Sequence, residues 1–399
     1  MKAYRLGVIG FGRRMSDVMK SLLDLSPDSR VIAVLDKNES YARENMKNAG
    51  VDPDVVRFFT DETAFFNEGQ PDGILIGTNC VDHAQYAAEV LRRNIPLFLE
   101  KPVGITHRDL DLLSGYAVKN PPVTVSFPLR VTPLFARAME IVKSGVLGKI
   151  SQVQAVNNVY YGRGYYKKWY RNDALTGGLF LQKATHDVDC IFTLLGGQLP
   201  YRVIAVSRKN IFKGNHPAGL HCADCAERES CPESDWNLEK FDGEPKQPDT
   251  CVFATDTGNE DSGSMILLFP SGIHAVYTQN FVVRKPVAGR SASSVMTAHW
   301  KFLLARTNSG FSTTTPAPWK SADLTARRAA IMAATGCSCA TSFRFLQARV
   351  RRPAGSLTAW SAPSFAWPRG NQPTKTGCRS SPISQKILDK FKISIYNDR

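Results

Sequence analysis

The sequence predicts an α/β fold for its first part and an α+β domain after it. Short apolar runs rich in β-branched residues alternate with amphipathic stretches up to residue 122, which is typical of parallel strands joined by helices. From Val123 the order changes to a strand, a helix and longer alternating segments. At 399 residues the chain is also longer than one hydrophobic core usually supports. We therefore predict two domains, over residues 1–122 and 123–288, followed by a separate segment over residues 289–399.

Apolar periodicity predicts the elements in chain order. Alternating or continuous β-branched runs predict strands, and apolar residues three or four apart predict helices. The predicted strands of the first domain are residues 4–9, 31–35, 55–59, 73–76 and 95–99, and its clearest helices are residues 16–25 and 83–93. In the second domain we expect a helix at about residues 133–144, ended by Gly145 and Gly148, and a strand over residues 150–160.

Composition argues against a membrane-spanning chain. Hydrophobic residues make up 43% and charged residues 22% of the sequence, and no apolar run approaches the roughly 20 residues that cross a bilayer. The first strand begins at residue 4 with no apolar targeting segment before it. Nine cysteines in such a chain indicate reduced thiols or metal ligands rather than a disulfide framework. We therefore expect a cytoplasmic protein with no membrane partner.

A glycine-rich turn follows the first predicted strand and precedes the first helix. Gly10 permits a tight turn, and Gly12 lets a pyrophosphate approach the backbone at a helix start whose N–H groups are free. Met15 stands where this fingerprint usually has a third glycine or an alanine. The motif predicts a Rossmann dinucleotide-binding domain. The turn residues predicted to bind the cofactor are Gly10, Phe11, Gly12, Arg13 and Arg14.

A carboxylate ends the second predicted strand. Asp36 lies 24 residues after Gly12, where it can accept hydrogen bonds from both ribose hydroxyls of NAD and repel the 2′-phosphate of NADP. The alternative is an ordinary polar strand end, and the adjacent Lys37 tolerates a phosphate. We predict NAD as the cofactor, with NADP less favoured.

Three ordered motifs resemble those of the Gfo/Idh/MocA family, named after glucose–fructose oxidoreductase and inositol dehydrogenase. Residues 100–102 (Glu-Lys-Pro) follow the fifth predicted strand, and residues 83–84 (His-Ala) lie 17 positions before that motif. Residues 177–189, which begin with Gly-Gly and contain a His and two Asp, are similar to the active-site helix of the family. The resemblance covers about residues 4–288.

The resemblance implies a second domain built on a large, mostly antiparallel open sheet, through which relatives commonly form oligomers. It also implies an NAD(P)-dependent oxidoreductase that transfers a hydride between the nicotinamide and a secondary alcohol of a sugar, polyol or sugar derivative. We therefore expect a small sugar or polyol as substrate, a homo-oligomer, and no nucleic-acid partner. The cofactor-binding residues that the resemblance adds are Thr78, Asn79, His83, Glu100 and Lys101.

Lys101 and His186 are the main candidate catalytic residues. Oxidation of an alcohol needs a group that takes the hydroxyl proton and a cation beside the developing oxyanion. Lys101 follows a parallel strand at its carboxyl end, where ligands bind in open α/β sheets. His186 is the candidate general base because imidazole titrates near neutral pH. The alternatives are a solvated lysine and a structural histidine.

The proton path departs from the family pattern. Many relatives have an Asp four residues before the histidine, whereas Gln182 stands there in this chain and cannot take a proton. Lys183 resembles a subgroup that places a lysine at this position. We therefore include Lys183 among the candidate catalytic residues and leave two paths open, one through Lys183 and one directly to water.

An aromatic and basic stretch over residues 160–171 precedes the glycine pair. Aromatic rings stack on sugar faces, and basic side chains bind hydroxyls or carboxylates. The alternative is an aromatic-rich segment that packs on the sheet. The candidate substrate residues are Arg130, Tyr166, Trp169 and Arg171.

Three cysteines form a C-x2-C-x5-C cluster in the second domain. Cys222, Cys225 and Cys231 have the spacing of structural zinc ligands, and Cys251 is available as a fourth. No second C-x2-C pair accompanies them, so an insertion with reduced thiols is the alternative. We predict no catalytic metal and retain structural zinc only as a candidate.

Two other functions fit the same family fold. One is a non-catalytic regulator that senses a dinucleotide, and the other is an NAD-assisted glycosidase that oxidises and re-reduces its cofactor within one cycle. Lys101 and His186 favour the dehydrogenase, whereas Gln182 weakens that argument. Accumulation of free NADH distinguishes the dehydrogenase from the glycosidase.

The formal net charge of +14 is located in the last segment. Residues 290–399 hold 17 Lys and Arg against three Asp, whereas residues 1–289 hold 33 basic and 33 acidic residues. Residues 290–399 also contain no Glu, which is common in folded domains. One interpretation of this charge is a genuine basic extension that binds nucleic acid or a membrane. No recognition motif supports that interpretation.

We interpret this segment as the product of a shifted reading frame. Codon degeneracy allows residues 295–301, read one nucleotide back, to encode Gly-Tyr-Asp-Gly-Thr-Leu-Glu, which resembles a turn and strand of the family. Residues 331–340 and 366–376 agree on the same shift. We hypothesise a frameshift between about residues 279 and 295. The expected consequences of such a frameshift are a disordered tail, an unpaired sheet edge and an inactive protein.

Overall fold

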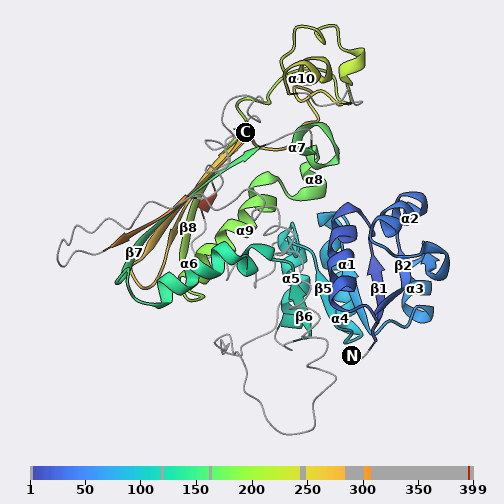
Figure 1. The fold of residues 1–399 in the computed structure, drawn as a ribbon. Helices are drawn as coiled ribbons and strands as arrows, with labels where there is room; N and C mark the ends of the chain where they lie inside the picture. Colours follow the sequence, from blue (N-terminus) through green and yellow to red (C-terminus); the bar gives the residue numbers. More distant parts are fainter. Residues whose placement is uncertain are drawn as a thin grey trace, which may run out of the picture.

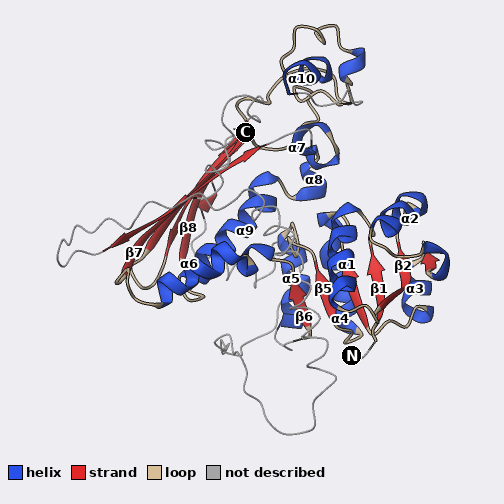
Figure 2. Ribbon diagram, viewed as in Figure 1, coloured by secondary structure: helices blue, strands red, loops and turns tan. Residues whose placement is uncertain are grey.

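The computed structural model describes residues 3–117, 121–160, 164–242, 249–283, 301–306 and 394–395. These residues form two six-stranded sheets, each with its own helices (Figures 1 and 2). The predicted fold class, a parallel α/β domain followed by an α+β domain, is confirmed by this arrangement.

The first sheet is parallel throughout, in the order β3-β2-β1-β4-β5-β6. Its strands are β1 (Arg5–Ile9), β2 (Arg30–Leu35), β3 (Arg57–Phe59), β4 (Gly73–Ile76), β5 (Leu97–Leu99) and β6 (Val123–Val125). The chain runs outward from β1 to β3 and then returns to β4 on the other side of β1. The carboxyl ends of β1 and β4 therefore flank the switch point where ligands bind in sheets of this class.

Helices bury both faces of the first sheet. They are α1 (Arg13–Leu25), α2 (Glu39–Asn48), α3 (Glu62–Glu68), α4 (His83–Arg92) and α5 (His107–Ala117), with 3-10 turns at Pro53–Val55 and Cys80–Asp82. Val8 packs in one apolar cluster with Met15 of α1, whereas its neighbour Ile9 packs in a second cluster with Val90 of α4. Successive strand residues point to opposite faces, so the sheet lies between two cores.

The second sheet is mixed, in the order β11-β7-β10-β9-β8-β12. Its strands are β7 (Ile150–Tyr160), β8 (Arg202–Arg208), β9 (Ser262–Leu268), β10 (His274–Val283), β11 (Lys301–Arg306) and β12 (Ser394–Ile395). Of the five pairings described, three are antiparallel, and the β7–β10 and β8–β12 pairs are parallel. The sheet is therefore mostly antiparallel, as predicted.

One helix covers the inner face of the second sheet. Ala184 and Ile191 of α9 pack in one cluster with strand residues such as Leu267 and Tyr277, and α9 lies between this sheet and the first domain (Figure 1). The helices here are α6 (Pro133–Lys143), α7 (Gly164–Lys167), α8 (Asp173–Thr176), α9 (Leu179–Leu194) and α10 (Asp235–Asp242), with 3-10 turns at Pro128–Val131, Trp169–Arg171 and Cys222–Asp224. None of the helices in the described ranges is long and apolar enough to cross a bilayer.

The sixth strand corrects the predicted domain boundary. The prediction starts the second domain at residue 123, but β6 pairs with β5 through Leu97↔Val123 and Leu99↔Val125. A parallel edge strand needs only a short apolar run to pair with its neighbour, and such a run does not reveal which sheet it joins. The first domain therefore extends through β6.

The third strand begins later than its apolar run predicts. Pro53–Val55 forms a 3-10 turn, and the Asp52 carboxylate caps it by accepting the Asp54 N–H at 3.0 Å. Proline at the first position of the turn adds to this local preference. Strand pairing therefore begins only at Arg57, opposite Ala33 of β2.

Two short strands from the last segment lie at the edges of the second sheet. β11 pairs antiparallel with β7, and β12 pairs parallel with β8. The expectation of an unpaired sheet edge is wrong at these two places, because backbone pairing to an edge requires no particular side chain. The other residues of 289–399 lie outside the described residues, and the frameshift hypothesis stays a prediction.

Candidate active site

The turn after β1 leaves open space at the start of α1. Gly10 has a φ of +80°, and a Cβ there would lie 2.7 Å from the backbone nitrogen of Thr78. A Cβ on Gly12 would meet no atom within 4 Å. Gly12 is also the N-cap of α1, and no side chain caps this helix. The first N–H groups of α1 are therefore available to a pyrophosphate, so the turn fits the dinucleotide predicted from the motif.

Gly77, directly after β4, leaves room for the Met15 side chain at the third position of the glycine motif. The Met15 side chain is fully buried, and a Cβ on Gly77 would lie 2.6 Å from the Met15 Cε atom. The small residue that usually stands on the helix thus stands on the loop after β4 instead. The close packing of α1 against the sheet is preserved with Met15 in place.

Two backbone donors hold Asp36 at the end of β2. Its Oδ2 accepts the Phe11 N–H at 2.8 Å, and its Oδ1 accepts the Asn38 N–H at 2.9 Å. Each carboxylate oxygen has a second lone pair that is free to accept a ribose hydroxyl. The position therefore fits the adenosine ribose of NAD, and its negative charge opposes a 2′-phosphate.

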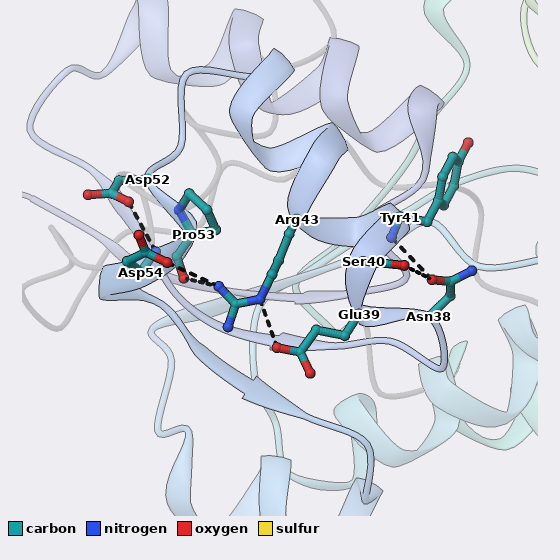
Figure 3. A network of polar contacts seen from close by, with 8 residues as sticks. All are labelled: Asn38, Glu39, Ser40, Tyr41, Arg43, Asp52, Pro53 and Asp54. Atoms are coloured by element: carbon teal, nitrogen blue, oxygen red, sulfur yellow. Dashed lines mark hydrogen bonds and ion pairs between the residues drawn. The ribbon is translucent and has the colours of Figure 1, made fainter.

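A polar network around Arg43 fixes the chain that follows β2 (Figure 3). Asn38 caps α2 by accepting the Tyr41 N–H at 3.1 Å. Arg43 donates to Glu39 at 2.7 Å and to the Pro53 carbonyl at 3.1 Å. The network joins the start of α2 to the turn before β3, and so stabilises the backbone beside the ribose position.

Both ring nitrogens of His83 are close to backbone carbonyls of the loops at the site. Its side chain is buried, with Nδ1 2.7 Å from the Pro102 carbonyl oxygen and Nε2 3.2 Å from the Thr78 carbonyl oxygen. Burial lowers the pKa of His83. The ring joins the loop after β4 to the loop after β5, so we assign it a positioning role.

An ion pair lies beside the β5 strand end. Arg14 of α1 donates through Nε to Glu100 at 2.9 Å and through Nη2 to Ser126 at 3.3 Å. Glu100 is buried, so its charge needs this partner. Arg13 at the start of α1 and Asn79 in the loop after β4, two other predicted cofactor residues, are exposed.

Lys101 reaches from the first domain to α9 of the second. Its Nζ donates to the Gln182 carbonyl at 3.2 Å. Burial and then the charge of Lys183 lower the pKa of Lys101 to about 8. The carboxyl end of β5 and the candidate active-site helix thus meet at Lys101, although they are far apart in the chain.

His186 lies one helical turn after Gln182 on α9. Its Nδ1 is buried and has no hydrogen-bond partner among the described residues, and its ring packs edge-to-face on Phe127 with centroids 6.2 Å apart. Burial, followed by the charges of Lys101, Lys183 and Arg14, holds the pKa of His186 well below its usual value. A neutral imidazole with an unpaired nitrogen can accept a proton.

Tyr165 is a site residue that the sequence prediction missed. Lys183 donates to the Tyr165 hydroxyl at 2.8 Å, and Tyr165 packs edge-to-face on Tyr170 with centroids 5.6 Å apart. Burial raises the pKa of Tyr170. The only signal in the sequence was the aromatic run itself, which does not show which rings face α9.

Asp187 anchors α9 and was also missed. It is buried, and it accepts hydrogen bonds from Asn157 Nδ2 at 2.7 Å and from the Tyr277 hydroxyl. Burial raises the pKa of Asp187, and the two hydrogen bonds oppose that shift. Adjacent residues on a helix point in different directions. Binding Asp187 to β7 and β10 therefore fixes the direction in which His186 points.

Two predicted substrate residues lie inside the protein. Tyr166 is fully buried and donates to the Glu260 carbonyl at 2.9 Å. Arg171 is buried and donates to Asp256 at 2.7 Å. Tyr166 offers no surface to a substrate. For this residue the structure agrees with the other interpretation of the aromatic stretch, in which its rings pack against the domain.

The other two predicted substrate residues differ from each other. Arg130 forms a two-pronged ion pair with Asp189, with 2.6 Å between Nε and Oδ2, so its guanidinium is already engaged. Trp169 is 42% exposed and stacks on Tyr170 at a centroid distance of 3.9 Å. Of the four candidates, Trp169 is the exposed aromatic ring, and an exposed ring can stack on a sugar.

Two family models match most of the chain. One, described as an oxidoreductase family with an NAD-binding Rossmann fold, matches residues 4–127. The other, described as the GFO/IDH/MocA C-terminal domain, matches residues 135–290. The junction between them agrees with the corrected domain boundary after β6.

The curated relatives are distant in sequence. YteT of Bacillus subtilis (strain 168) is 26% identical over 247 residues, which cover 55% of this chain and 57% of that protein. Inositol 2-dehydrogenase 2 of Saccharopolyspora erythraea is 24% identical over 200 residues, which cover 49% of this chain and 54% of that protein. The chain thus spans just over half the length of these relatives.

Solved structures show the same fold at low identity. The myo-inositol 2-dehydrogenase of Lactobacillus plantarum is 17% identical with a TM-score of 0.57, and the match covers 86% of this chain and 90% of that one. GenD2 from gentamicin A biosynthesis, solved with NAD, is 14% identical with a TM-score of 0.57, and the match covers 89% of both chains. With both domains matched and the glycine turn, Lys101 and α9 assembled at one edge, the chain belongs to the Gfo/Idh/MocA oxidoreductase family, whose first domain is an NAD-binding Rossmann fold.

Proposed function

We propose that the protein is an NAD-dependent oxidoreductase that transfers a hydride between the nicotinamide and a secondary alcohol of a sugar, polyol or sugar derivative. The contact between Lys101 and α9 carries this proposal. The Lys101 ammonium donates to the Gln182 carbonyl, one helical turn before His186. A cation and a base are therefore assembled at the carboxyl edge of the first sheet, where the nicotinamide binds in this fold.

The two side chains divide the proton and charge chemistry between them. NAD, when bound, supplies the hydride acceptor. Neutral His186 accepts the hydroxyl proton of the alcohol, and its buried position keeps it unprotonated at neutral pH. The Lys101 ammonium stabilises the negative charge that develops on the alcohol oxygen. In the reverse direction the same groups return the proton and polarise the carbonyl.

The hydrogen bond between Lys183 and Tyr165 supports the proton path through Lys183. It joins an ammonium on α9, three residues before His186, to a hydroxyl on α7 at 2.8 Å, so a proton donor and an acceptor are already paired there. The names of two matched relatives, both inositol dehydrogenases, support a polyol as the substrate class. The exposed ring of Trp169 supports a sugar-like ring as well.

The test is NADH formation by the full chain with a panel of inositols, sugars and sugar acids. We expect Lys101→Met and His186→Asn each to lower kcat/KM by about 10²–10⁴-fold. Lys143→Met is the matched control, because Lys143 is an exposed lysine at the end of α6, and we expect no loss. NAD binding with no turnover of any substrate would instead support the regulator, and glycoside cleavage without accumulation of NADH would support the glycosidase.

A further inference from the structure

A segment of the second domain leaves the sheet between β8 and β9. Residues 209–261 begin after Arg208 and end before Ser262, and Figure 1 shows them projecting beyond the sheet around α10. The Asp261 N–H donates to the Arg208 carbonyl at 2.9 Å and closes the base of the segment. We call residues 209–261 the cysteine lobe, because they contain four of the six cysteines in the described residues.

Among its described residues, the cysteine lobe has no apolar cluster of its own. In the described residues, the apolar clusters include only Phe212, Val252 and Phe253 from this lobe, and these three pack against Tyr166 of the main body. The regular structure in the rest of the lobe is a short 3-10 turn and the eight residues of α10. Loop-rich segments without a core are usually held by disulfides or a metal ion. All four cysteines of the lobe are free thiols, which are available as metal ligands.

Backbone pairing brings three of these cysteines together. Cys222 and Cys225 flank a 3-10 turn in which the Cys225 N–H donates to the Cys222 carbonyl at 3.3 Å. Across an antiparallel bridge, the Cys222 N–H donates to Asp249 at 2.8 Å and the Cys251 N–H donates to Leu220 at 2.7 Å. This register places Cys222 and Cys251 as diagonal neighbours on one face, about 7–8 Å apart at their Cα atoms.

Two consecutive turns connect Cys231 to Cys225. The Arg228 N–H donates to the Cys225 carbonyl at 3.1 Å, and the Cys231 N–H donates to the Glu227 carbonyl at 2.8 Å. The Asn237 amide donates to the Glu229 and Cys231 carbonyls, both at 2.9 Å, and so fixes the chain at Cys231. The backbone therefore turns back at Cys231, six residues after Cys225.

Lys167 is buried at the base of the cysteine lobe. Its Nζ donates to the Glu233 carbonyl and lies 3.4 Å from the Asp249 carboxylate. Four thiolates around a divalent zinc ion carry a net negative charge, and a buried ammonium stabilises such a cluster. This lysine also joins two segments of the lobe to α7 of the main body.

We propose that the cysteine lobe binds one structural zinc ion through four thiolates. The ligands are Cys222, Cys225, Cys231 and Cys251. Four protein ligands close a tetrahedral site with no open position, so the metal is structural rather than catalytic. No group of three or more His, Cys, Asp and Glu side chains in the described ranges already stands in a metal-binding arrangement. The backbone places the four cysteines near one another, and their side chains have to move to coordinate zinc. Zinc binding is therefore coupled to the folding of the lobe.

The test is elemental analysis of the untagged full chain. We expect about one zinc ion per chain in the unmodified protein, and a fall to background in Cys225→Ser and Cys231→Ser. Cys225→His is the rescue variant, because imidazole is a zinc ligand, and it is expected to retain zinc. Ser230→Ala, an exposed neighbour of Cys231, is the matched control and is expected to retain zinc.

A second measurement is independent of whether the serine variants fold. The unmodified protein loaded with cobalt should show a thiolate-to-metal charge-transfer absorption, and a chelator should abolish it and make residues 209–261 sensitive to protease. Absence of bound metal after growth with zinc, equal zinc in Cys225→Ser and the unmodified protein, or iron with inorganic sulfide would each overturn the proposal. These readouts require no turnover, so they are unaffected if the proposed oxidoreductase activity fails.

Discussion

Burial gives Lys101 a pKa within the working range of an enzyme. Because its pKa is lowered to about 8, the ammonium is present below that pH and lost above it. We therefore expect kcat/KM for the alcohol, at saturating NAD, to fall as the pH rises through about 8. An acidic limb should appear well below the usual pKa of histidine, where His186 gains a proton.

Lys101→Arg separates the Lys101 cation from other causes of the alkaline limb. Arginine stays charged throughout this range. We expect the variant to lose the alkaline limb while keeping a reduced rate. A profile whose alkaline limb is unchanged in Lys101→Arg would show that another group titrates there.

The charge of Asp36 predicts the choice between NAD and NADP. Asp36→Asn keeps the size of the side chain but removes the charge that opposes a 2′-phosphate. A hydrogen bond to a charged group contributes about 1.5–3 kcal/mol, so we expect the preference for NAD, measured as a ratio of kcat/KM values, to fall by about tenfold or more. An unchanged ratio would mean that Asp36 serves only to hold the Phe11 and Asn38 N–H groups.

At the scale of elements, the start of α9 depends on two glycines. Gly177 and Gly178 have φ values of +76° and +86°, and a Cβ on Gly178 would lie 3.0 Å from Oε2 of Glu260. Glu260 in turn accepts the Phe180 N–H at the start of the helix. A left-handed backbone and a close carboxylate therefore require glycine here, and this turn sets the direction in which α9 carries Lys183 and His186.

Gly178→Ala should destabilise the second domain. The strained backbone and the close contact with Glu260 cost about 1–3 kcal/mol, which lowers Tm by about 2–4 °C for each kcal/mol in a domain of this size. Gly164→Ala is the control, because a Cβ there meets nothing within 4 Å, and alanine favours the helix. Scanning calorimetry checks both variants, and an equal Tm for the two would contradict the strain argument.

At the scale of the whole molecule, one face of the second sheet carries several exposed apolar side chains in the part of the chain that the structure describes. Ile204 and Ile266 stand directly opposite each other on β8 and β9 and are 43% and 40% exposed. Val156 and Val206 extend the same face. Ser264 and Thr278 lie between Val156 and Val206 on this face. Exposed apolar side chains gathered on one sheet face mark a protein interface, so we propose that two copies of the chain associate through it.

Ile204→Lys tests this interface. A lysine in the centre of an apolar contact has to bury an unpaired charge, so we expect the unmodified chain to run as an oligomer and the variant as a monomer in light scattering. Ile211→Lys is the control, because Ile211 is 55% exposed but lies on the cysteine lobe. A monomeric unmodified chain, or equal masses for all three proteins, would contradict the interface.

The reading frame of the last segment has its own test. We expect nucleotide sequencing across codons 279–295 to reveal a single-base insertion or deletion, because three stretches agree on one shift. The repaired chain should then replace the basic residues that account for the net charge of +14. An intact frame with no alternative reading would make the basic segment a genuine part of the protein.

The sequence by itself predicted the first five strands of the first sheet and the residues that we propose for the cofactor site. Gly10, Gly12 and Asp36 are recognisable because their roles depend on the backbone conformation and charge at the ends of two neighbouring strands, and such local requirements leave a spacing pattern. Lys101 and His186 were identified from motifs in the same way. The C-x2-C-x5-C spacing also marked the segment that we propose to bind zinc, since the spacing of ligands within a turn is visible in the sequence.

Only the tertiary structure decided which side chains face one another. Periodicity does not show that β6 joins the first sheet. It also does not show that Tyr165, rather than Tyr166, accepts a hydrogen bond from Lys183, or that Arg130 forms an ion pair with Asp189. Each of these contacts joins segments that are distant in sequence or depends on the rotation of about 100° between adjacent residues of a short helix. Local propensity is the same for either outcome, and burial against a distant partner selects between them.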